Sequence, residues 1–243
     1  MNETPTLLLV HGSWHGPWCW EKLTPQLDRL GLKWASVSLP CVGDDPSRLG
    51  TMMDDAAAIE TAAAAISGDV VIVAHSYGGI PTTQAQFGPN VKRLVYLGAF
   101  MVDSGESLAS LLPPGPLPPF VVDNGDGSTS VAPALAVETF YADCDPATAA
   151  WAVSKLRLHN GICNVTPVTR AAWREIPSAY ILLTEDHACP TFIQRRIASR
   201  AREVREMAGS HSPFLSKPSE LAAMLAELAT GVAQGAQQRT AGA

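Results

Sequence analysis

Residues 70–79, VVIVAHSYGG, decide the fold, because four apolar residues run into a serine that two glycines follow closely. An unbroken apolar run is typical of a strand that is buried on both faces of a parallel sheet. A strand that turns at a serine straight into a helix is a nucleophile elbow, usually written G-x-S-x-G. Ala74 takes the first glycine position and Gly78 the second, and both are small enough for the sharp turn. Ser76 is therefore the predicted nucleophile.

Strands and helices alternate along most of the chain. Apolar runs predict strands at 6–10, 33–39, 70–74, 91–97, 179–183 and 203–207, and apolar spacing predicts helices at 17–30, 51–67, 76–87, 190–200 and around 221–228. This alternation indicates an α/β fold with a mostly parallel sheet of about six strands and helices on both faces. Ser76 follows the third strand, which argues against the alternative of a plain strand-to-helix turn with an incidental serine.

A long segment, 103–177, interrupts the alternation. It contains LLPPGPLPPF at 111–120, which is incompatible with a regular helix or a central strand. The segment is too long for an ordinary connection. We expect residues 103–177 to form a lid over a core of residues 1–102 and 178–243, at the sheet edge where open α/β sheets bind ligands.

The serine needs a general base, and the base an acid that orients it. His211 follows the last strand and comes last in chain order, as the base does in this kind of fold. It is favoured over the other five histidines, which are His11, His15, His75, His159 and His187. Asp186, in the loop after the fifth strand, is the predicted acid, with Asp103 and Glu185 as alternatives.

The oxyanion that forms on attack needs two backbone donors. We expect the N–H of Tyr77, directly after the nucleophile, and that of Ser13, where Gly12 allows a close approach. A glycine-rich loop after a strand could instead cradle a phosphate, but the chain has neither G-x-G-x-x-G nor G-x-x-x-x-G-K-[ST]. No cofactor is therefore expected.

Several motifs together resemble the α/β-hydrolases, and most of all the branch of plant methyl esterases, plant hydroxynitrile lyases and related bacterial esterases. These motifs are LLLVHGSWHGPWCWEKLTPQLDRLG, AHSYGG, LGAFM, LLTEDHACP and GSHSPFLSKP. The resemblance implies the triad of Ser76, Asp186 and His211 and a serine hydrolase of carboxylesterase type. Many of the lyases have a lysine after the catalytic histidine and a threonine after the first loop histidine. This chain has Ser212 and Gly12 there, which favours ester hydrolysis.

The expected reaction is cleavage of a small hydrophobic ester through an acyl-enzyme. The alternatives are a lactonase or natural-product tailoring hydrolase or cyclase, a hydroxynitrile lyase-like C–C lyase, and a non-catalytic small-molecule receptor. No arginine or lysine occurs between Arg93 and Lys155, so a neutral ester or lactone is expected. The predicted pocket residues are aromatic: Trp14, Phe100, Phe120, Trp151 and Phe214.

The composition limits which binding partners and which cellular location we expect for the protein. The formal net charge of −6 and the lack of a basic cluster argue against nucleic-acid binding. No apolar stretch is long enough to span a membrane. The absence of a signal-peptide pattern, together with five scattered cysteines, favours a cytoplasmic protein without disulfides or a metal site. A homodimer is compatible with the sequence, and residues 234–243 are expected to form a frayed tail.

Overall fold

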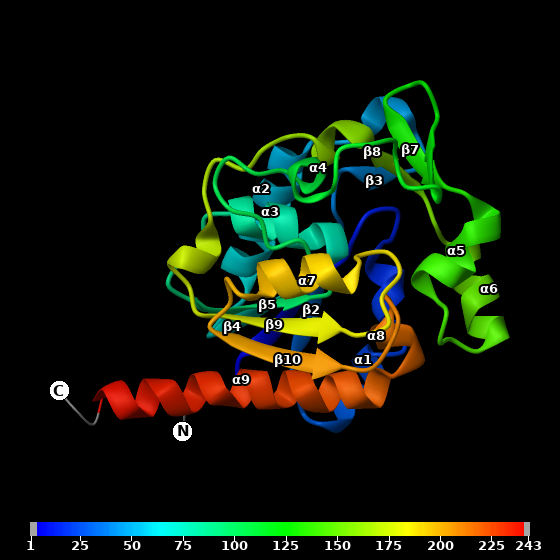
Figure 1. Ribbon diagram of the computed structural model, residues 1–243. Coiled ribbons are helices and arrows are strands. Elements are labelled where there is room, and N and C mark those ends of the chain that lie inside the picture. The colour runs from blue at the N-terminus through cyan, green and yellow to red at the C-terminus, as the bar shows by residue number, and fades with distance from the viewer. Residues whose placement is uncertain (1–3, 241–243) are drawn as a thin grey trace.

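A six-stranded parallel sheet forms the centre of the computed structural model, which describes residues 4–240 and, from 232 onward, only the course of the backbone. The strands lie in the order β10-β9-β5-β4-β1-β2 (Figure 1). Their bounds are β1 (Thr6–Val10), β2 (Trp34–Val37), β4 (Val70–His75), β5 (Val91–Leu97), β9 (Ser178–Leu183) and β10 (Glu203–Met207). The prediction of six strands is confirmed, and β4, which ends at the predicted nucleophile, lies between β5 and β1.

Helices cover both faces of this sheet (Figure 1). They are α1 (Thr24–Arg29), α2 (Met52–Ala65), α3 (Gly79–Gln84), α7 (Thr191–Ala198), α8 (Pro213–Ser216) and α9 (Pro218–Thr240). Successive side chains of a strand point to opposite faces. Leu8 and Ile72 therefore join the core under α2, α3 and α7, whereas Leu7 and Val71 join the core against α1 and α9. Burial on both faces explains the unbroken apolar runs.

Three predicted helical segments differ in the structure, and one of them, 76–87, consists of the 3₁₀ turn η3 (Ser76–Gly78) and α3, which ends at Gln84. The segment 17–30 is divided into the 3₁₀ turn η1 (Pro17–Trp20) and α1, in which Pro25 lies in the first turn. Proline lacks an N–H and is tolerated at a helix start, so a second helix begins there. At the C-terminus α9 continues to Thr240, through most of the predicted frayed tail, and residues 241–243 lie outside the described residues.

The segment between β5 and β9 builds a second, smaller sheet. It contains α4 (Leu108–Leu111), β6 (Val121–Asp123), β7 (Ser128–Val131), α5 (Pro133–Phe140), α6 (Pro146–Ser154), β8 (Leu158–Asn160), η4 (Gly161–Asn164) and η5 (Ala172–Arg174). Three of these strands join β3 (Val42–Gly43) in the order β3-β8-β7-β6. The remaining 3₁₀ turn is η2 (Pro46–Arg48). The predicted division into core and lid stays a prediction, and β3 comes from the part assigned to the core.

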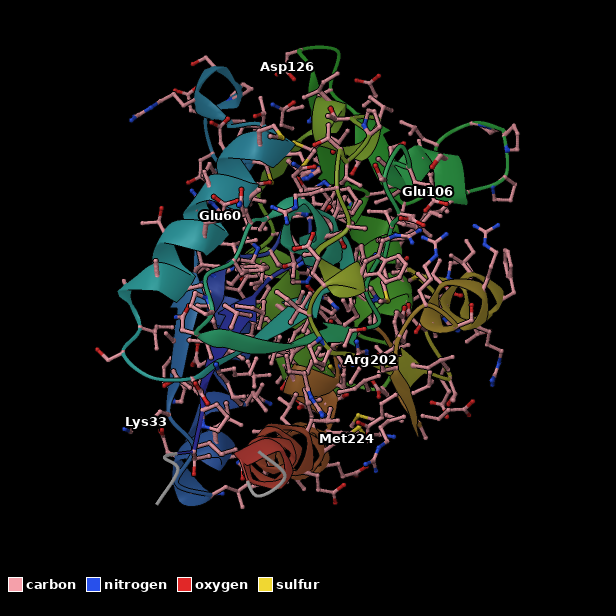
Figure 2. The ribbon with its side chains drawn as sticks, turned by 90° about the vertical axis from the view of Figure 1, so that its left-hand side faces the viewer. Lys33, Glu60, Glu106, Asp126, Arg202 and Met224 are labelled. Atoms are coloured by element: carbon pink, nitrogen blue, oxygen red, sulfur yellow. The ribbon has the colours of Figure 1, made fainter. Side chains whose placement is uncertain are left out.

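The second sheet lies beyond the C-terminal ends of the main strands (Figure 1). Figure 2 shows the turn that carries Asp126, between β6 and β7, at the outer edge of the molecule. Within the described residues, no helix combines the length and the apolarity needed to cross a bilayer.

Candidate active site

Ser76 lies at a tight turn directly after β4. Its φ of 54° falls in the left-handed region, which residues other than glycine rarely adopt. A Cβ at Gly78 would lie only 2.5 Å from the carbonyl oxygen of His11, and one at Gly79 only 2.8 Å from that of Phe100. Both glycines are therefore required by close backbone contacts. Ala74, at the first glycine position of the motif, is fully buried.

His211 and Asp186 form a buried hydrogen-bonded pair. His211 Nδ1 lies 2.8 Å from Asp186 Oδ2, and both side chains are almost fully buried. The other carboxylate oxygen accepts the backbone N–H groups of Ala188 and Cys189 at 2.8 and 2.9 Å. With Nδ1 donating to the carboxylate, Nε2 is the nitrogen that can accept a proton. This is the arrangement that a serine nucleophile needs.

The two alternative acids lie in other surroundings. Arg174 donates to both carboxylate oxygens of Asp103, and this hydrogen-bonded ion pair lowers the pKa of that carboxyl group. Glu185 is exposed to solvent. Among the three candidates, Asp186 is the one hydrogen-bonded to His211.

Gln194 on α7 is a further hydrogen-bond partner of Asp186, the predicted acid. The sequence analysis did not single it out. Its Nε2 donates to Asp186 Oδ2 at 2.9 Å, and its Oε1 accepts the N–H of Leu183 at 3.0 Å. The side chain is fully buried, on the same face of α7 as the buried Ile193 and Ile197. A glutamine on the buried face of an amphipathic helix was the available signal.

His75 supports the loop that carries the base. Its Nε2 lies 2.8 Å from the carbonyl oxygen of His211, to which it donates, and the two rings are 4.4 Å apart. Burial, followed by the nearby His211, lowers the pKa of His75 well below its usual value. His75 is thus a neutral neighbour of His211, the predicted base.

Three further histidines are buried and serve the structure around the site. His11 accepts the N–H of Leu39 at 3.1 Å, and His15 lies 2.8 Å from the hydroxyl of Tyr141. Burial lowers the pKa of His11 to about 4 and those of His15 and His159 to about 3. His187, by contrast, is exposed and lines the cavity described below.

The loop after β1 lies directly against the nucleophile. A Cβ at Gly12 would be 2.7 Å from Ser76 Cβ and 3.2 Å from Ser76 Oγ. Ser13 follows and lines the same cavity as Ser76. Tyr77 is fully buried and its hydroxyl donates to Asp55 at 2.7 Å, so its side chain points away from the reacting groups. The predicted donors therefore lie on the two segments that meet at Ser76.

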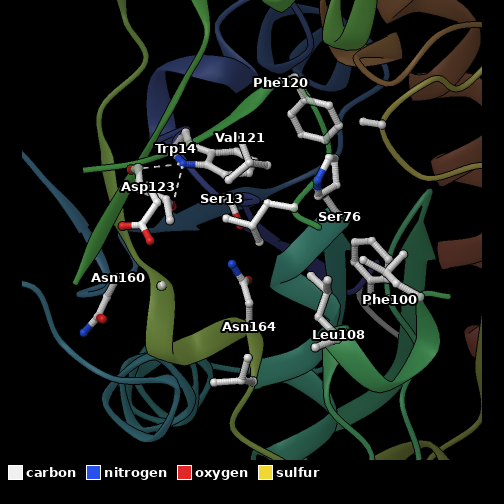
Figure 3. A pocket seen from close by; sticks show the side chains of 18 of the residues that line it. Ser13, Trp14, Ser76, Phe100, Leu108, Phe120, Val121, Asp123, Asn160 and Asn164 are labelled. Atoms are coloured by element: carbon white, nitrogen blue, oxygen red, sulfur yellow. Dashed lines mark hydrogen bonds between the residues drawn. The ribbon is translucent and has the colours of Figure 1, made fainter. Parts of the chain in front are cut away.

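A cavity of about 680 Å³ opens above Ser76. Figure 3 shows Ser76 and Ser13 at its base with Trp14, Phe100 and Phe120 around them. The indole N–H of Trp14 donates to the carbonyl and hydroxyl oxygens of Thr129, each at 3.2 Å. The segment between β5 and β9, called the insertion below, supplies most of the remaining apolar wall. Its larger apolar residues there are Leu108, Leu112, Leu117, Val121, Phe140, Ile162 and Val165. Among the residues that the structure describes, neither lysine nor arginine lines the cavity.

Two predicted pocket residues lie elsewhere. Phe214 is fully buried in the core, where its ring lies 4.8 Å from the rings of both Trp20 and His75. Trp151 packs edge-on against Trp18, with ring centroids 5.4 Å apart. Neither contributes to the lining of the cavity. The sequence predicts both as pocket residues because they lie near the catalytic loops or in the lid segment of the chain. Position along the chain does not specify where a side chain points.

One group of side chains outside the triad has metal-ligand chemistry. The ligand atoms of Cys41, His159 and Cys163 all lie within 4.8 Å of one another. The sequence analysis expected no metal site because the cysteines are scattered, but pairing of β3 with β8 brings the three residues together.

Comparisons with known proteins identify the family and the fold of this chain. The Alpha/beta hydrolase family model matches residues 7–224. The chain is 32% identical over 238 residues to an alpha/beta hydrolase, nvfD, of Aspergillus novofumigatus, covering 91% of this chain and 95% of that one. It is 28% identical to methylesterase 7 of Arabidopsis thaliana, covering 94% and 97%. The crystal structure of a pyrethroid hydrolase from Sphingobium faniae superposes with a TM-score of 0.80 at 22% identity, covering 95% and 99%.

Proposed function

The chain belongs to the alpha/beta hydrolase family, and we propose that it is a serine hydrolase that cleaves small, neutral, hydrophobic carboxylic esters through an acyl-enzyme. The predicted class of enzyme, of carboxylesterase type, is confirmed by the family and by relatives that include a methylesterase. The observation that carries the proposal is Ser76 at its strained elbow, at the base of an apolar cavity, beside the loops that hold the His211–Asp186 pair.

The reaction begins with attack of Ser76 Oγ on the ester carbonyl. His211 Nε2 takes the serine proton and then gives it to the leaving alcohol. Asp186 keeps Nδ1 protonated and stabilises the imidazolium, and the N–H groups of Ser13 and Tyr77 stabilise the oxyanion. Water, activated by the same histidine, then attacks the acyl-enzyme and releases the acid.

The walls of the cavity support a neutral hydrophobic substrate. Aromatic and aliphatic side chains make up most of the lining, and Asp123 is its one carboxylate among the described residues. A cavity of about 680 Å³ has the size of a site for a small organic molecule. Within the described part of the chain, the lining offers no lysine or arginine with which an anionic group, such as a phosphate, could pair.

Ester hydrolysis is favoured over cyanohydrin cleavage by two positions. Ser212, after the base, has no charge to take up cyanide, and its side chain is fully buried. Gly12 has no room for a side chain, because a Cβ there would be 2.7 Å from Ser76 Cβ. At both positions this chain differs from the pattern of the plant hydroxynitrile lyases, which belong to the branch that its motifs resemble.

A matched ester series tests the substrate class. We expect kcat/KM for a neutral p-nitrophenyl butyrate to exceed that for the p-nitrophenyl ester of succinate, and that for a cationic analogue of equal length, by at least about 10-fold, the loss expected when a charge is desolvated without a partner. Lactones and thioesters of similar size complete the panel, with Ser76→Ala as background. Equal or higher kcat/KM for the charged esters would contradict the proposed substrate class.

A further inference from the structure

A cluster of buried sulfur and nitrogen atoms lies where the insertion meets the main body. In the antiparallel pairing of β3 with β8, Val42 is opposite His159, which brings the preceding Cys41 to the same place. Cys163 follows in η4. The candidate ligand atoms lie within 4.8 Å of one another, and all three residues are fully buried. Two thiols and an imidazole are ligands that thiophilic metal ions prefer.

His159 has an unpartnered nitrogen in this cluster. Its Nδ1 is buried and makes no hydrogen bond, while Nε2 lies 3.5 Å from Ser13 Oγ. Buried polar atoms are nearly always paired. A neutral imidazole with one orphaned nitrogen beside two thiols is a group for which a metal ion would supply the missing partner.

A buried carboxylate, Asp55, lies next to Cys41. Asp55 is fully buried and accepts the N–H of Cys41 at 2.9 Å and the hydroxyl of Tyr77 at 2.7 Å. Among the described residues it forms no ion pair with lysine or arginine, and a bare buried charge is costly. A divalent cation nearby would compensate that charge.

We propose that Cys41, His159 and Cys163 form a structural zinc site. Binding of Zn²⁺ replaces the two thiol protons, so two thiolates balance the charge of the ion and two protons leave to solvent. His159 donates its neutral imidazole lone pair as the third protein ligand. No electron is transferred and the triad takes no part.

The site would join two parts of the chain. Cys41 directly precedes β3, in the part of the chain that was predicted as core. His159 and Cys163 belong to the insertion. His159 is also the neighbour of Ser13, the predicted oxyanion donor. Zinc would therefore hold the insertion against the loop after β1 and raise the thermal stability of the whole chain.

Metal binding to the full chain gives the direct test. The reduced protein is stripped of metal, mixed with one equivalent of Zn²⁺ or Co²⁺, and separated from free ions. We expect about one ion per chain by elemental analysis, a higher Tm, and for Co²⁺ the intense near-ultraviolet absorption of thiolate-to-metal charge transfer. Cys41→Ser and Cys163→Ser should each lose the charge-transfer intensity and at least about 10-fold in affinity, as loss of a ligand implies.

Cys144→Ser is the matched control, because Cys144 is a half-exposed thiol outside the cluster. It should bind the ions like the wild type. His159→Gln provides a third ligand variant should a cysteine variant fail to fold. Failure of the wild type to retain zinc, binding that all three ligand variants preserve, or a Cys41–Cys163 disulfide in the protein prepared without reductant in place of zinc would each overturn the proposal.

Discussion

At the catalytic edge of the sheet, backbone atoms approach so closely that side chains are excluded, whereas the wall of the cavity above it consists of side chains. Positions 12, 78 and 79 would each place a Cβ less than 3 Å from another atom. Most of the wall comes from short helices and loops of the insertion, where Leu117 and Val165 are about half exposed, and Trp14 and Phe100 complete it. The edge is thus fixed by backbone geometry, while the wall can change its side chains without disturbing it. We infer that the edge sets the reaction and the wall sets the substrate.

Removing the nucleophile should have the largest effect. Ser76→Ala deletes the attacking oxygen, and because the members of a triad act as a unit, kcat should fall by roughly 10⁶-fold for every ester. The Tm should stay within a few degrees of the wild type, since the backbone of the elbow is retained. Steady-state kinetics and thermal denaturation measure both. A loss confined to some esters would place Ser76 in the wall instead.

The acid should come next in size. Asp186→Asn keeps the hydrogen-bonding shape but allows the wrong tautomer of His211, which should lower kcat by about 10⁴-fold. Asp103→Asn is the matched control, because Asp103 pairs with Arg174 and should change kcat by less than about 3-fold, as expected for a largely exposed ion pair. If Asp103→Asn lowered kcat more than Asp186→Asn, the acid would be Asp103, in the segment after β5.

A change in the wall should act selectively. Phe120→Ala removes an aromatic ring that packs against Trp14, with centroids 6.2 Å apart. We expect kcat/KM for aryl esters to fall by about 10-fold or more and that for acetate esters to change little, since lost apolar contacts cost about 1–3 kcal/mol. Phe192→Ala, at an exposed position outside the cavity, is the control. Equal losses for all esters would contradict the division between edge and wall.

The smallest expected effect concerns stability, and it comes from a buried histidine between the catalytic edge and the cavity wall. His15 lies beside Ser13 and Tyr141, and burial lowers its pKa to about 3 from 6.5. In the unfolded chain it binds a proton at a higher pH than in the folded protein. Its contribution to the free energy of unfolding is therefore complete above pH 6.5 and is lost as the pH falls toward 3, by up to about 1.4 kcal/mol per pH unit.

Urea unfolding of wild type and His15→Gln between pH 7.5 and 4.5 measures this loss. The variant should show a shallower decline in the free energy of unfolding, because it has one fewer buried group that protonates on unfolding. Parallel curves for the two proteins would mean that His15 is already protonated in the folded state.

The fold and the candidate triad could be predicted because each candidate triad residue comes within a few positions of the end of a predicted strand. Ser76 directly follows β4, Asp186 lies in the loop after β9, and His211 lies in the loop after β10. Chain order in a parallel sheet then brings those loops to one edge. Local sequence therefore carries most of the information about the edge.

The wall and its neighbours depend on contacts between distant segments, and there the predictions were incomplete. Phe214 turns into the core and Trp151 packs on Trp18, although both lie near the right loops in the chain. Gln194 acquires its role through the packing of α7 against β9. The group of Cys41, His159 and Cys163 forms where β3 pairs with β8, and β3 is a strand of two residues that no apolar run predicts.

The most direct test of the central claim is to trap the acyl-enzyme. A slowly deacylating ester, p-nitrophenyl pivalate, is mixed with the wild-type protein, quenched in acid and analysed by intact-mass and peptide mass spectrometry. The account predicts a burst of about one p-nitrophenol per chain and a pivaloyl adduct on the peptide that contains Ser76, because acylation precedes hydrolysis. Turnover without a burst, or an adduct at a residue other than Ser76, would contradict it.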